Sequence, residues 1–556
     1  MPTKSVPSRH PIRHPIRRQT RHPIRRPILS LALSALILAA GLSAPAPVAA
    51  QVTAFKQAVA EAAYDHDGVA AFYRGNGYQP IWTGSGEADR ARRAALMAAL
   101  ETAPQHGLPA ARHDAAALMA QMRQARSSRD LGRVEVALSK AFVRLGRDLQ
   151  SGFLTPARID PGLVREVARP SGETLLAGLA AAADPAAYMR GLAPQTAEYR
   201  ALMRQKWHLE RIVAEGGWGR PVQAGKLEPG DTGPAVIALR NRLIAMGYLG
   251  RSVSRSYDPA MEAAVRAFQT AHGLEPDGVA GAATLAEINT APEERLKSVL
   301  VALERERWLN RDRGARHVLV NLTDFSAAIV DHGAVTFRTR SVVGKNTSDR
   351  RTPEFSDVME HMVINPSWYV PRSIITKEYL PQLRANPHAV SHIEITDSRG
   401  RRVNRGAVDF SQYSARSFPF AMRQPPGSRN ALGLVKFMFP NKHNIYLHDT
   451  PQKHLFAREV RAYSHGCIRL ADPFDFAYAL LARQSDDPKA LFHGILNTGK
   501  ETKVDLEEPI PVHIIYRTAF TGARGELQFR RDVYGRDAAI WDAMSAAGVV
   551  LDTVQG

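Results

Sequence analysis

The spacing of hydrophobic residues divides the chain into regions with different expected structure. From about Val52 to Gly219, apolar residues recur at helical spacing in segments rich in Ala, Arg and Leu, such as ADRARRAALMAALETAPQHGL and VEVALSKAFVRLGRDLQSGFL. We therefore predict a helical scaffold domain over residues 51–225. Three isolated histidines in it are interpreted as surface or hydrogen-bonded side chains: His106, His113 and His208.

A stretch dense in Gly and Pro, GRPVQAGKLEPGDTGPAV, marks the boundary to a second unit, predicted over residues 226–292. The second of its three short helices begins at Asp258-Pro259, a capping residue followed by proline at the first helical position. So small a unit buries little surface, and it needs unusually good packing or a neighbour. The residues expected to face its core are Val236, Leu239, Leu243, Met246, Met261, Val265, Phe268, Leu285 and Ile288.

The period changes from helical to alternating after EERLKSVLVALERERWLN, which we predict as a linker helix within residues 293–315. HVLVNL, FSAAIVDHGAVTFRTRSVVG and HMVINP alternate like strands, and Asp331-His332-Gly333 predicts a hairpin turn. We predict a mainly β domain over residues 316–520, followed by a segment, 521–556, that packs on the scaffold or on the β domain. The expected fold class is multidomain α+β.

The alternation breaks down between Pro371 and Gly427. SIITKEYLPQL has a helical pattern, SHIEITDSRGRRVN resembles a hairpin, and the rest is rich in Pro, Ser and Arg. An insertion of this length in a β core is longer than an ordinary loop. We interpret residues 371–427 as a capping lid.

The N-terminus has the layout of a secretory signal. Lys4 and seven arginines without an acid lead into an apolar run, roughly Ile28 to Leu42, that is too short to span a bilayer. Val48-Ala49-Ala50 supplies small residues for cleavage before Gln51, so residues 1–50 are predicted as a signal peptide, by an export route left open. No second apolar run of membrane-spanning length follows, and we expect an exported protein without a membrane span.

Charge adds little to this picture. The chain holds 73 Lys and Arg against 54 Asp and Glu, and eight of the basic residues lie in the predicted leader, which leaves +11 for residues 51–556. A basic exported protein suits an anionic matrix such as a carboxylate-rich cell wall, and equally a freely soluble state. We expect no nucleic-acid partner.

Cys467, in YSHGCIRL, is the only cysteine of the chain, so no disulfide within the chain can form. A thiol nucleophile needs a base or a cationic neighbour, and the candidates are His448 and His465. A buried structural cysteine stays open as an alternative. A zinc site at His448, His465 and Cys467 is disfavoured, because neither HExxH nor paired CxxC is present.

Two stretches carry a resemblance to known families. LEPGDTGPAVIALRNRLIAMGYL followed by YDPAMEAAVRAFQTAHGLEPDGVAGAATLAEIN resembles the peptidoglycan-binding three-helix module of cell-wall enzymes. Eighteen residues separate His448 from Cys467 in SHGC, which resembles the signature of L,D-transpeptidases of the YkuD type. SVVGKNTSDRRTPEFS, INPSWYVP, GLVKFMFPN and IYLHDTP are similar to the larger Gram-negative branch, which has a scaffold, a binding module and a capping insertion.

The second resemblance implies roles for particular residues. Cys467 is the expected nucleophile and His448 its base, with the backbone carbonyl of Asp449 orienting the imidazole. His465 and Gly466 frame the nucleophile, and the backbone N–H groups of Gly466 and Cys467 are the expected oxyanion donors. The expected substrate-binding residues are Tyr446, Ser464 and Arg469.

Arg469 departs from many smaller family members, which have asparagine two residues past the cysteine. Its guanidinium can grip a carboxylate of the stem peptide, or pair with an internal acid. The sequence leaves both alternatives open.

The implied reaction transfers an acyl group from a peptidoglycan tetrapeptide donor, with loss of D-alanine, to the amine of a diamino acid on a second stem, which gives a 3→3 cross-link in cell-wall biogenesis and shape. No metal or organic cofactor is expected. Alternatives are an L,D-carboxypeptidase, a ligase that joins proteins to peptidoglycan, or a non-catalytic wall-binding protein. The expected location is periplasmic and wall-associated, with stem peptides as partners and cell-wall synthesis enzymes as further candidates.

Overall fold

A computed structural model describes residues 46–310, 312–522 and 525–551. Residues 51–556 form one compact unit. Most of the predicted signal peptide lies outside the described residues, and the first described helix, α1 (Ala46–Ala63), begins near its end. In the part of the chain that the structure describes, no helix has the length and apolar character needed to cross a membrane.

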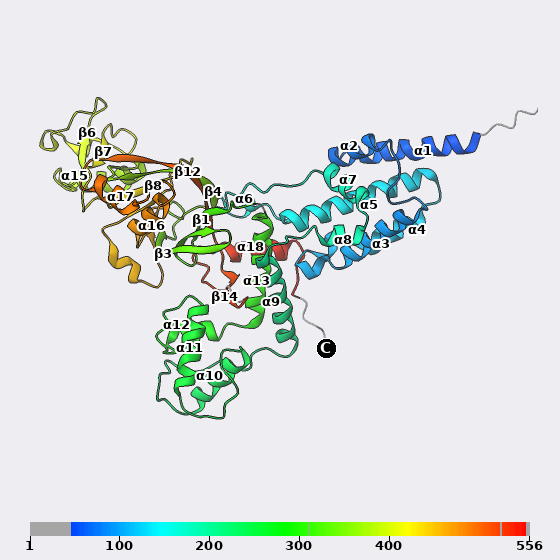
Figure 1. The fold of residues 1–556 in the computed structure, drawn as a ribbon, viewed down its shortest axis with the longest axis horizontal. Helices are drawn as coiled ribbons and strands as arrows, with labels where there is room; N and C mark the ends of the chain where they lie inside the picture. Colours follow the sequence, from blue (N-terminus) through cyan, green and yellow to red (C-terminus); the bar gives the residue numbers. More distant parts are fainter. Residues whose placement is uncertain (1–45, 311, 523–524, 552–556) are drawn as a thin grey trace, which may run out of the picture. The chain divides into compact units, whose positions relative to one another are not determined.

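The N-terminal part of this unit is helical, as predicted (Figure 1). A capping box of Ser127 and Asp130 begins its long central helix, α5, whose Glu135 is fully buried and accepts hydrogen bonds from the backbone N–H groups of Ile81 and Thr83. The helices are α2 (Asp67–Gly75), α3 (Glu87–Glu101), α4 (Ala115–Gln124), α5 (Ser128–Ser151), α6 (Pro156–Ile159), α7 (Gly172–Ala181), α8 (Pro185–Arg190) and α9 (Ala197–Ala214).

The predicted three-helix unit is present as α10 (Pro234–Ala245), α11 (Pro259–Ala271) and α12 (Ala282–Ile288). Asp258 caps α11 by accepting a hydrogen bond from Met261 N at 2.9 Å. The predicted core residues are buried together, with Met246 at the edge. The C-terminal segment supplies the neighbour that so small a unit needs: the ring of Phe529 stacks on His272, with centroids 5.5 Å apart.

The predicted linker helix is α13 (Pro292–Trp308), and it is buried along most of its length. Its Arg305 pairs with Glu354 of the β domain at 3.0 Å and with Asp537 of the C-terminal helix α18 (Arg536–Ala546) at 2.6 Å. Buried charges require such pairing. This helix therefore joins the scaffold, the β domain and the C-terminal segment.

The β domain is built on one sheet that, among the described residues, has nine strands in the order β10-β3-β11-β9-β8-β4-β12-β1-β2. A further pairing of β2 with β3 closes the sheet on itself. The predicted hairpin turn is confirmed, with positive φ at His332 and Gly333. The strands are β1 (Arg316–Asn321), β2 (Ser326–Asp331), β3 (Ala334–Gly344), β4 (Phe355–Ile364), β8 (Val435–Met438), β9 (Leu447–His448), β10 (Ala462–Ser464), β11 (Ile468–Leu470) and β12 (Thr502–Ile515).

The insertion forms a small subdomain with its own core, which includes Leu383, Phe410 and Met422. The helix predicted at SIITKEYLPQL is present over Arg372–Ala385, as α14 (Arg372–Ile374), a π-helical turn η3 (Ile375–Tyr379) and α15 (Leu380–Ala385). Strands β5 (Trp368–Tyr369), β7 (Ala421–Gln424) and β6 (Glu394–Thr396) pair beside it. The insertion thus has a hydrophobic core that is separate from the core of the β domain.

The α-helices and strands not yet described follow the motif segment. They are α16 (Pro473–Leu481), α17 (Pro488–Leu496), β13 (Ala519–Thr521), β14 (Leu527–Phe529) and α18. Together with the helical N-terminal regions and the mainly β domain, they confirm the predicted α+β class.

Candidate active site

Two short parallel strands bring the motif residues together. Strands β9 and β11 pair with His448 opposite Arg469, and Ile468 N donates to the Tyr446 carbonyl at 3.1 Å. The pairing places Cys467, which directly precedes β11, beside Tyr446. Residues about twenty positions apart in the sequence therefore share one end of the sheet.

A tight turn holds the cysteine. Ser464 is buried, and its Oγ accepts a hydrogen bond from Gly466 N at 3.1 Å and donates to the Cys467 carbonyl at 2.5 Å. Gly466 has a φ of +120°, and a Cβ there would lie 3.2 Å from Ile445 Cδ1. Glycine is needed for this backbone conformation. The turn uses the Gly466 N–H internally, whereas the Cys467 N–H has no hydrogen-bond partner among the described residues.

The thiol is half-buried at the wall of a cavity. Its Sγ lies 3.5 Å from the carbonyl oxygen of Asn444. Burial raises the pKa of Cys467 to about 11, although hydrogen bonding by Tyr446 and the positive charge of Arg469 act in the opposite direction. The resting group at neutral pH is therefore a thiol.

His448 is buried and oriented by the residue that follows it. Its Nδ1 lies 2.5 Å from the Asp449 carbonyl oxygen, so Nδ1–H donates and Nε2 is left as the basic nitrogen. Burial and the charge of Arg469 lower the pKa of His448 to about 3. Among the described residues, no hydrogen bond joins His448 to Cys467, but both line the same cavity.

The side chain of Asp449 holds neighbouring segments in place around His448. Its carboxylate accepts hydrogen bonds from Leu434 N at 2.9 Å and from Lys453 Nζ at 2.7 Å. Gly433, with a φ of +63°, approaches so closely that a Cβ would lie 2.2 Å from Asp449 Oδ2. Glycine is thus required for this close contact.

The cavity has a volume of about 820 Å³ and lies between the sheet end and the insertion. The π-helical turn of the insertion is tied to the sheet side: Glu378 Oε1 lies 2.6 Å from both His465 Nε2 and Arg350 Nη2, and Lys377 Nζ lies 2.6 Å from Asp349 Oδ2. The ring of His465 is therefore held by the insertion. Cavity-lining residues include Trp368, Glu378, Tyr379, Arg429, Tyr446, His448, Ser464, His465, Cys467 and Arg469.

Arg469 has no carboxylate partner among the described residues. Its Nη1 donates to Gln452 Oε1 at 2.6 Å, and its buried Nε has no hydrogen-bond partner. Of the two alternatives left open by the sequence, pairing with an internal acid is not seen in the described chain. Arg469 lines the cavity and is paired with no acid there, which suits an anionic ligand.

Sequence reasoning missed two residues that shape the site. Asn441 holds the loop before β9, because its Nδ2 donates to the Phe439 and Ile445 carbonyls and its Oδ1 accepts from His443 N at 3.0 Å. Glu378 was hidden inside a helical pattern of the insertion. The Pro-Asn sequence at the loop was a turn signal for Asn441, but no local pattern pointed to Glu378.

Histidine and cysteine also raise the question of a metal. Across the described ranges, no group of three or more His, Cys, Asp or Glu side chains is placed to hold a metal ion.

Family models match three parts of the chain. The "Scaffold domain" matches residues 67–205, the "Putative peptidoglycan binding domain" residues 232–288, and the "L,D-transpeptidase catalytic domain" of the YkuD type residues 315–505. The chain therefore carries an L,D-transpeptidase catalytic domain together with a peptidoglycan-binding domain and a scaffold domain. Both resemblances noted in the sequence are confirmed.

Similar proteins match parts of this chain. A Haemophilus influenzae protein named "Putative L,D-transpeptidase" is 31% identical over 225 residues, 40% of this chain and 45% of the relative. An uncharacterised protein of Kitasatospora aureofaciens is 41% identical over 64 residues, 11% of this chain and 54% of the relative. The chain spans about half the length of the curated relatives it matches.

A solved structure was also matched. The crystal structure of the L,D-transpeptidase from Xylanimonas cellulosilytica is 15% identical, with 53% of this chain and all of that chain covered, at a TM-score of 0.17.

Proposed function

We propose that this chain is a peptidoglycan L,D-transpeptidase that forms 3→3 cross-links between stem peptides through a thioester on Cys467. The observation that carries the proposal is the placement of the only thiol of the chain. It lines a covered cavity with His448 and Arg469, inside a domain of L,D-transpeptidase type.

The nucleophile is generated when the donor binds. At rest the thiol is protonated and the imidazole is neutral, since the pKa of Cys467 is raised to about 11 and that of His448 is lowered to about 3. A carboxylate of the donor that pairs with Arg469 offsets the positive charge that disfavours imidazolium. His448 Nε2 then takes the thiol proton more readily, directly or through one water.

The first step exchanges an amide for a thioester. The Cys467 thiolate attacks the carbonyl carbon of the third stem residue, and the Cys467 N–H donates to the oxyanion that forms. When the intermediate collapses, the C–N bond breaks and the imidazolium of His448 returns its proton to the leaving amine of D-alanine. Free D-alanine and an acyl-enzyme remain.

The second step transfers the acyl group from Cys467 to a new amine. The side-chain amine of a diamino acid on a second stem attacks the thioester carbonyl, and neutral His448 accepts a proton from it. The C–S bond breaks, the thiol is regenerated, and a new amide links the two stems. No step requires a cofactor or an external redox partner.

The lid favours transfer to an amine over hydrolysis. Ion pairs from Lys377 and Glu378 hold the insertion beside the cavity, and an insertion that covers the acyl-enzyme limits the access of water to a reactive thioester. An L,D-carboxypeptidase would use the same acyl-enzyme and differ only in the acceptor. The peptidoglycan-related domains indicate association with the cell wall, and we infer a periplasmic location, reached through the N-terminal leader.

One incubation tests the proposal. Purified disaccharide-tetrapeptide is mixed with the chain from Gln51 onward, and the products are identified by mass spectrometry. We expect a cross-linked dimer that has lost one D-alanine, and no product with Cys467→Ala. His448→Asn should slow formation of the acyl-enzyme by at least about 100-fold, the usual contribution of a general base.

The other outcomes are equally decisive. Tripeptide without dimer would identify a carboxypeptidase instead. A dimer that also forms with Cys467→Ala would rule out the thioester route. Thermal melting of each variant confirms that the fold is retained.

A further inference from the structure

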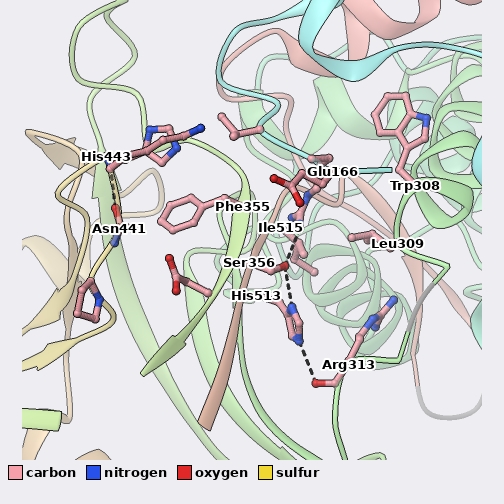
Figure 2. Close-up of a pocket in the computed structure, with 15 residues that line it drawn as sticks. Glu166, Trp308, Leu309, Arg313, Phe355, Ser356, Asn441, His443, His513 and Ile515 are labelled. Atoms are coloured by element: carbon pink, nitrogen blue, oxygen red, sulfur yellow. Dashed lines mark hydrogen bonds between the residues drawn. The ribbon is translucent and has the colours of Figure 1, made fainter. Parts of the chain in front are cut away.

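A second cavity, of about 370 Å³, lies on the other side of the loop that precedes β9. It forms where three parts of the chain meet: residues 164–166 after α6, the end of α13, and the β domain (Figure 2). Its volume falls within the range of small-molecule sites. The segment that supplies residues 164–166 is held against the β domain, because Glu354 N donates to the Gly162 carbonyl at 2.7 Å and Arg165 Nη1 donates to Ser356 Oγ at 3.1 Å.

The two cavities share a wall. His443 lines both of them, and the next residue, Asn444, places its carbonyl oxygen 3.5 Å from Cys467 Sγ. Since consecutive Cα atoms lie about 3.8 Å apart, the wall between the second cavity and the thiol is only two residues thick at His443 and Asn444.

The lining combines aromatic faces with hydrogen-bonding groups. The rings of Phe355 and His443 lie 5.1 Å apart at one side, and Trp308 lies at another (Figure 2). Asp357 is close enough to His443 to favour its protonated form electrostatically, although burial and Lys442 lower the pKa of His443 overall. Such a mixture suits a ligand that has apolar faces and many hydroxyl or amide groups.

A chain of hydrogen bonds holds a neutral histidine in one wall of the cavity. His513 Nδ1 lies 2.8 Å from Ser356 Oγ, and its Nε2 lies 3.0 Å from the Arg313 carbonyl oxygen, as the dashed lines in Figure 2 show. Burial lowers the pKa of His513 to about 4, so this ring is neutral at pH 7. Charged residues line the cavity as well: Arg165, Arg313 and Lys442 are basic, and Glu166 and Asp357 are acidic. A lining that combines charges of both signs with neutral hydrogen-bonding groups suits a polar ligand better than a strongly anionic one.

We propose that this second cavity binds an amino-sugar unit of the glycan strand that carries the donor stem peptide. The proposal rests on the proposed function, in which Cys467 attacks the third stem residue. Three extended residues span about 10 Å, long enough to reach across the two-residue wall at His443 and Asn444 to the thiol. The sugar anchors the strand, and the stem reaches past His443 into the catalytic cavity.

A binding measurement tests the site without turnover. The probe is the tetramer of N-acetylglucosamine, which has no peptide, and its affinity for the chain from Gln51 onward is measured by saturation-transfer NMR. Asp357→Trp fills the cavity. Val358→Trp is the matched control, because Val358 is the next residue of β4, is 43% exposed and does not line the cavity.

We expect Asp357→Trp to weaken binding of the tetramer by about tenfold or more, which corresponds to a loss of roughly 1.4 kcal/mol in binding free energy. Val358→Trp should bind the tetramer as tightly as the unmodified chain does. Asp357→Asn, which keeps the volume, should retain most of the affinity. Equal affinity in all variants would place the sugar elsewhere, for instance on the three-helix unit, and would overturn the proposal, as would no binding at all.

Kinetics give the second readout. The ratio of kcat/KM for disaccharide-tetrapeptide to that for free tetrapeptide should exceed about 10 in the unmodified chain and in Val358→Trp. In Asp357→Trp this ratio of kcat/KM values should approach 1, because KM for the sugar-bearing donor rises. An unchanged ratio contradicts the sugar site. If neither donor gives a product that depends on Cys467, the proposed function fails, and the binding comparison still decides the sugar site.

Discussion

The carboxylate of Glu378, in the insertion, lies 2.6 Å from Nε2 of His465, two residues before Cys467. The same oxygen lies 2.6 Å from Arg350 Nη2, in the loop that follows β3. One side chain of the insertion thus contacts both the motif that holds the nucleophile and the loop that packs against this motif. Lid position and the geometry of the motif are physically coupled through this carboxylate.

Loss of the Glu378 charge should loosen the lid. We expect Glu378→Gln to raise the ratio of hydrolysed tripeptide to cross-linked dimer by about fivefold, since a half-exposed ion pair contributes about 1 kcal/mol. Mass spectrometry of the products measures this ratio. The matched control is Glu394→Gln, whose ion pairs with Arg402 and Arg423 lie within the insertion. A similar rise in both variants would show that the lid contact with His465 has no special role.

The pH dependence of alkylation should report the raised pKa of Cys467. Below a pKa of about 11, the thiolate fraction grows about tenfold for each pH unit, so the rate with iodoacetamide should rise steadily from pH 7 to pH 10. Tyr446→Phe should react more slowly at each pH, because hydrogen bonding by Tyr446 lowers the pKa of the thiol. A plateau above pH 8 would instead show that a thiolate is already present at rest.

Arg469 should act mainly on donor binding. Arg469→Gln removes the guanidinium that faces the cavity, and we expect KM for the tetrapeptide donor to rise by about tenfold, the effect of one lost charge-assisted hydrogen bond. Arg469→Lys keeps the charge without the planar fork and should give an intermediate KM. Steady-state kinetics with both variants measure this, and an unaltered KM in Arg469→Gln would exclude a carboxylate contact.

His272 should make the packing of the three-helix unit sensitive to acid. The ring is buried between Phe268 and Phe529, and burial together with Arg295 and Arg530 lowers its pKa to about 3. Below about pH 6.5, His272 binds a proton in the unfolded chain but not in the folded chain. The free energy of unfolding is therefore highest above pH 6.5 and decreases as the pH falls toward 3.

At pH 5 this loss is about 2 kcal/mol for one group. We expect His272→Phe to reduce the fall in the free energy of unfolding between pH 7 and pH 5 by about that amount. Denaturant titration at the two pH values measures it. His208→Gln, at an exposed position on α9, should leave the difference unchanged, and an equal effect of both substitutions would contradict the assignment to His272.

Local patterns were sufficient for much of this protein. Three features depend on residues that are adjacent in sequence, and each was predictable: the Asp258-Pro259 start of α11, the His332-Gly333 turn and the alternating pattern of β1. The placement of Tyr446 and His448 beside Cys467 was suggested by motif spacing. Asn441 was missed, because a turn signal does not say which of several loops will support a site.

The sequence by itself determined the element types, the order of the domains, the single thiol and its candidate histidine, since helical and strand periods and short motifs are properties of neighbouring residues. Only the tertiary structure decided that Glu378 reaches His465 across 87 positions, that Arg469 finds no acid partner in the described chain, and that a second cavity shares His443 with the first. These relations arise from packing between distant segments, where each contact depends on the whole arrangement of the sheet and the insertion, and no local period encodes them.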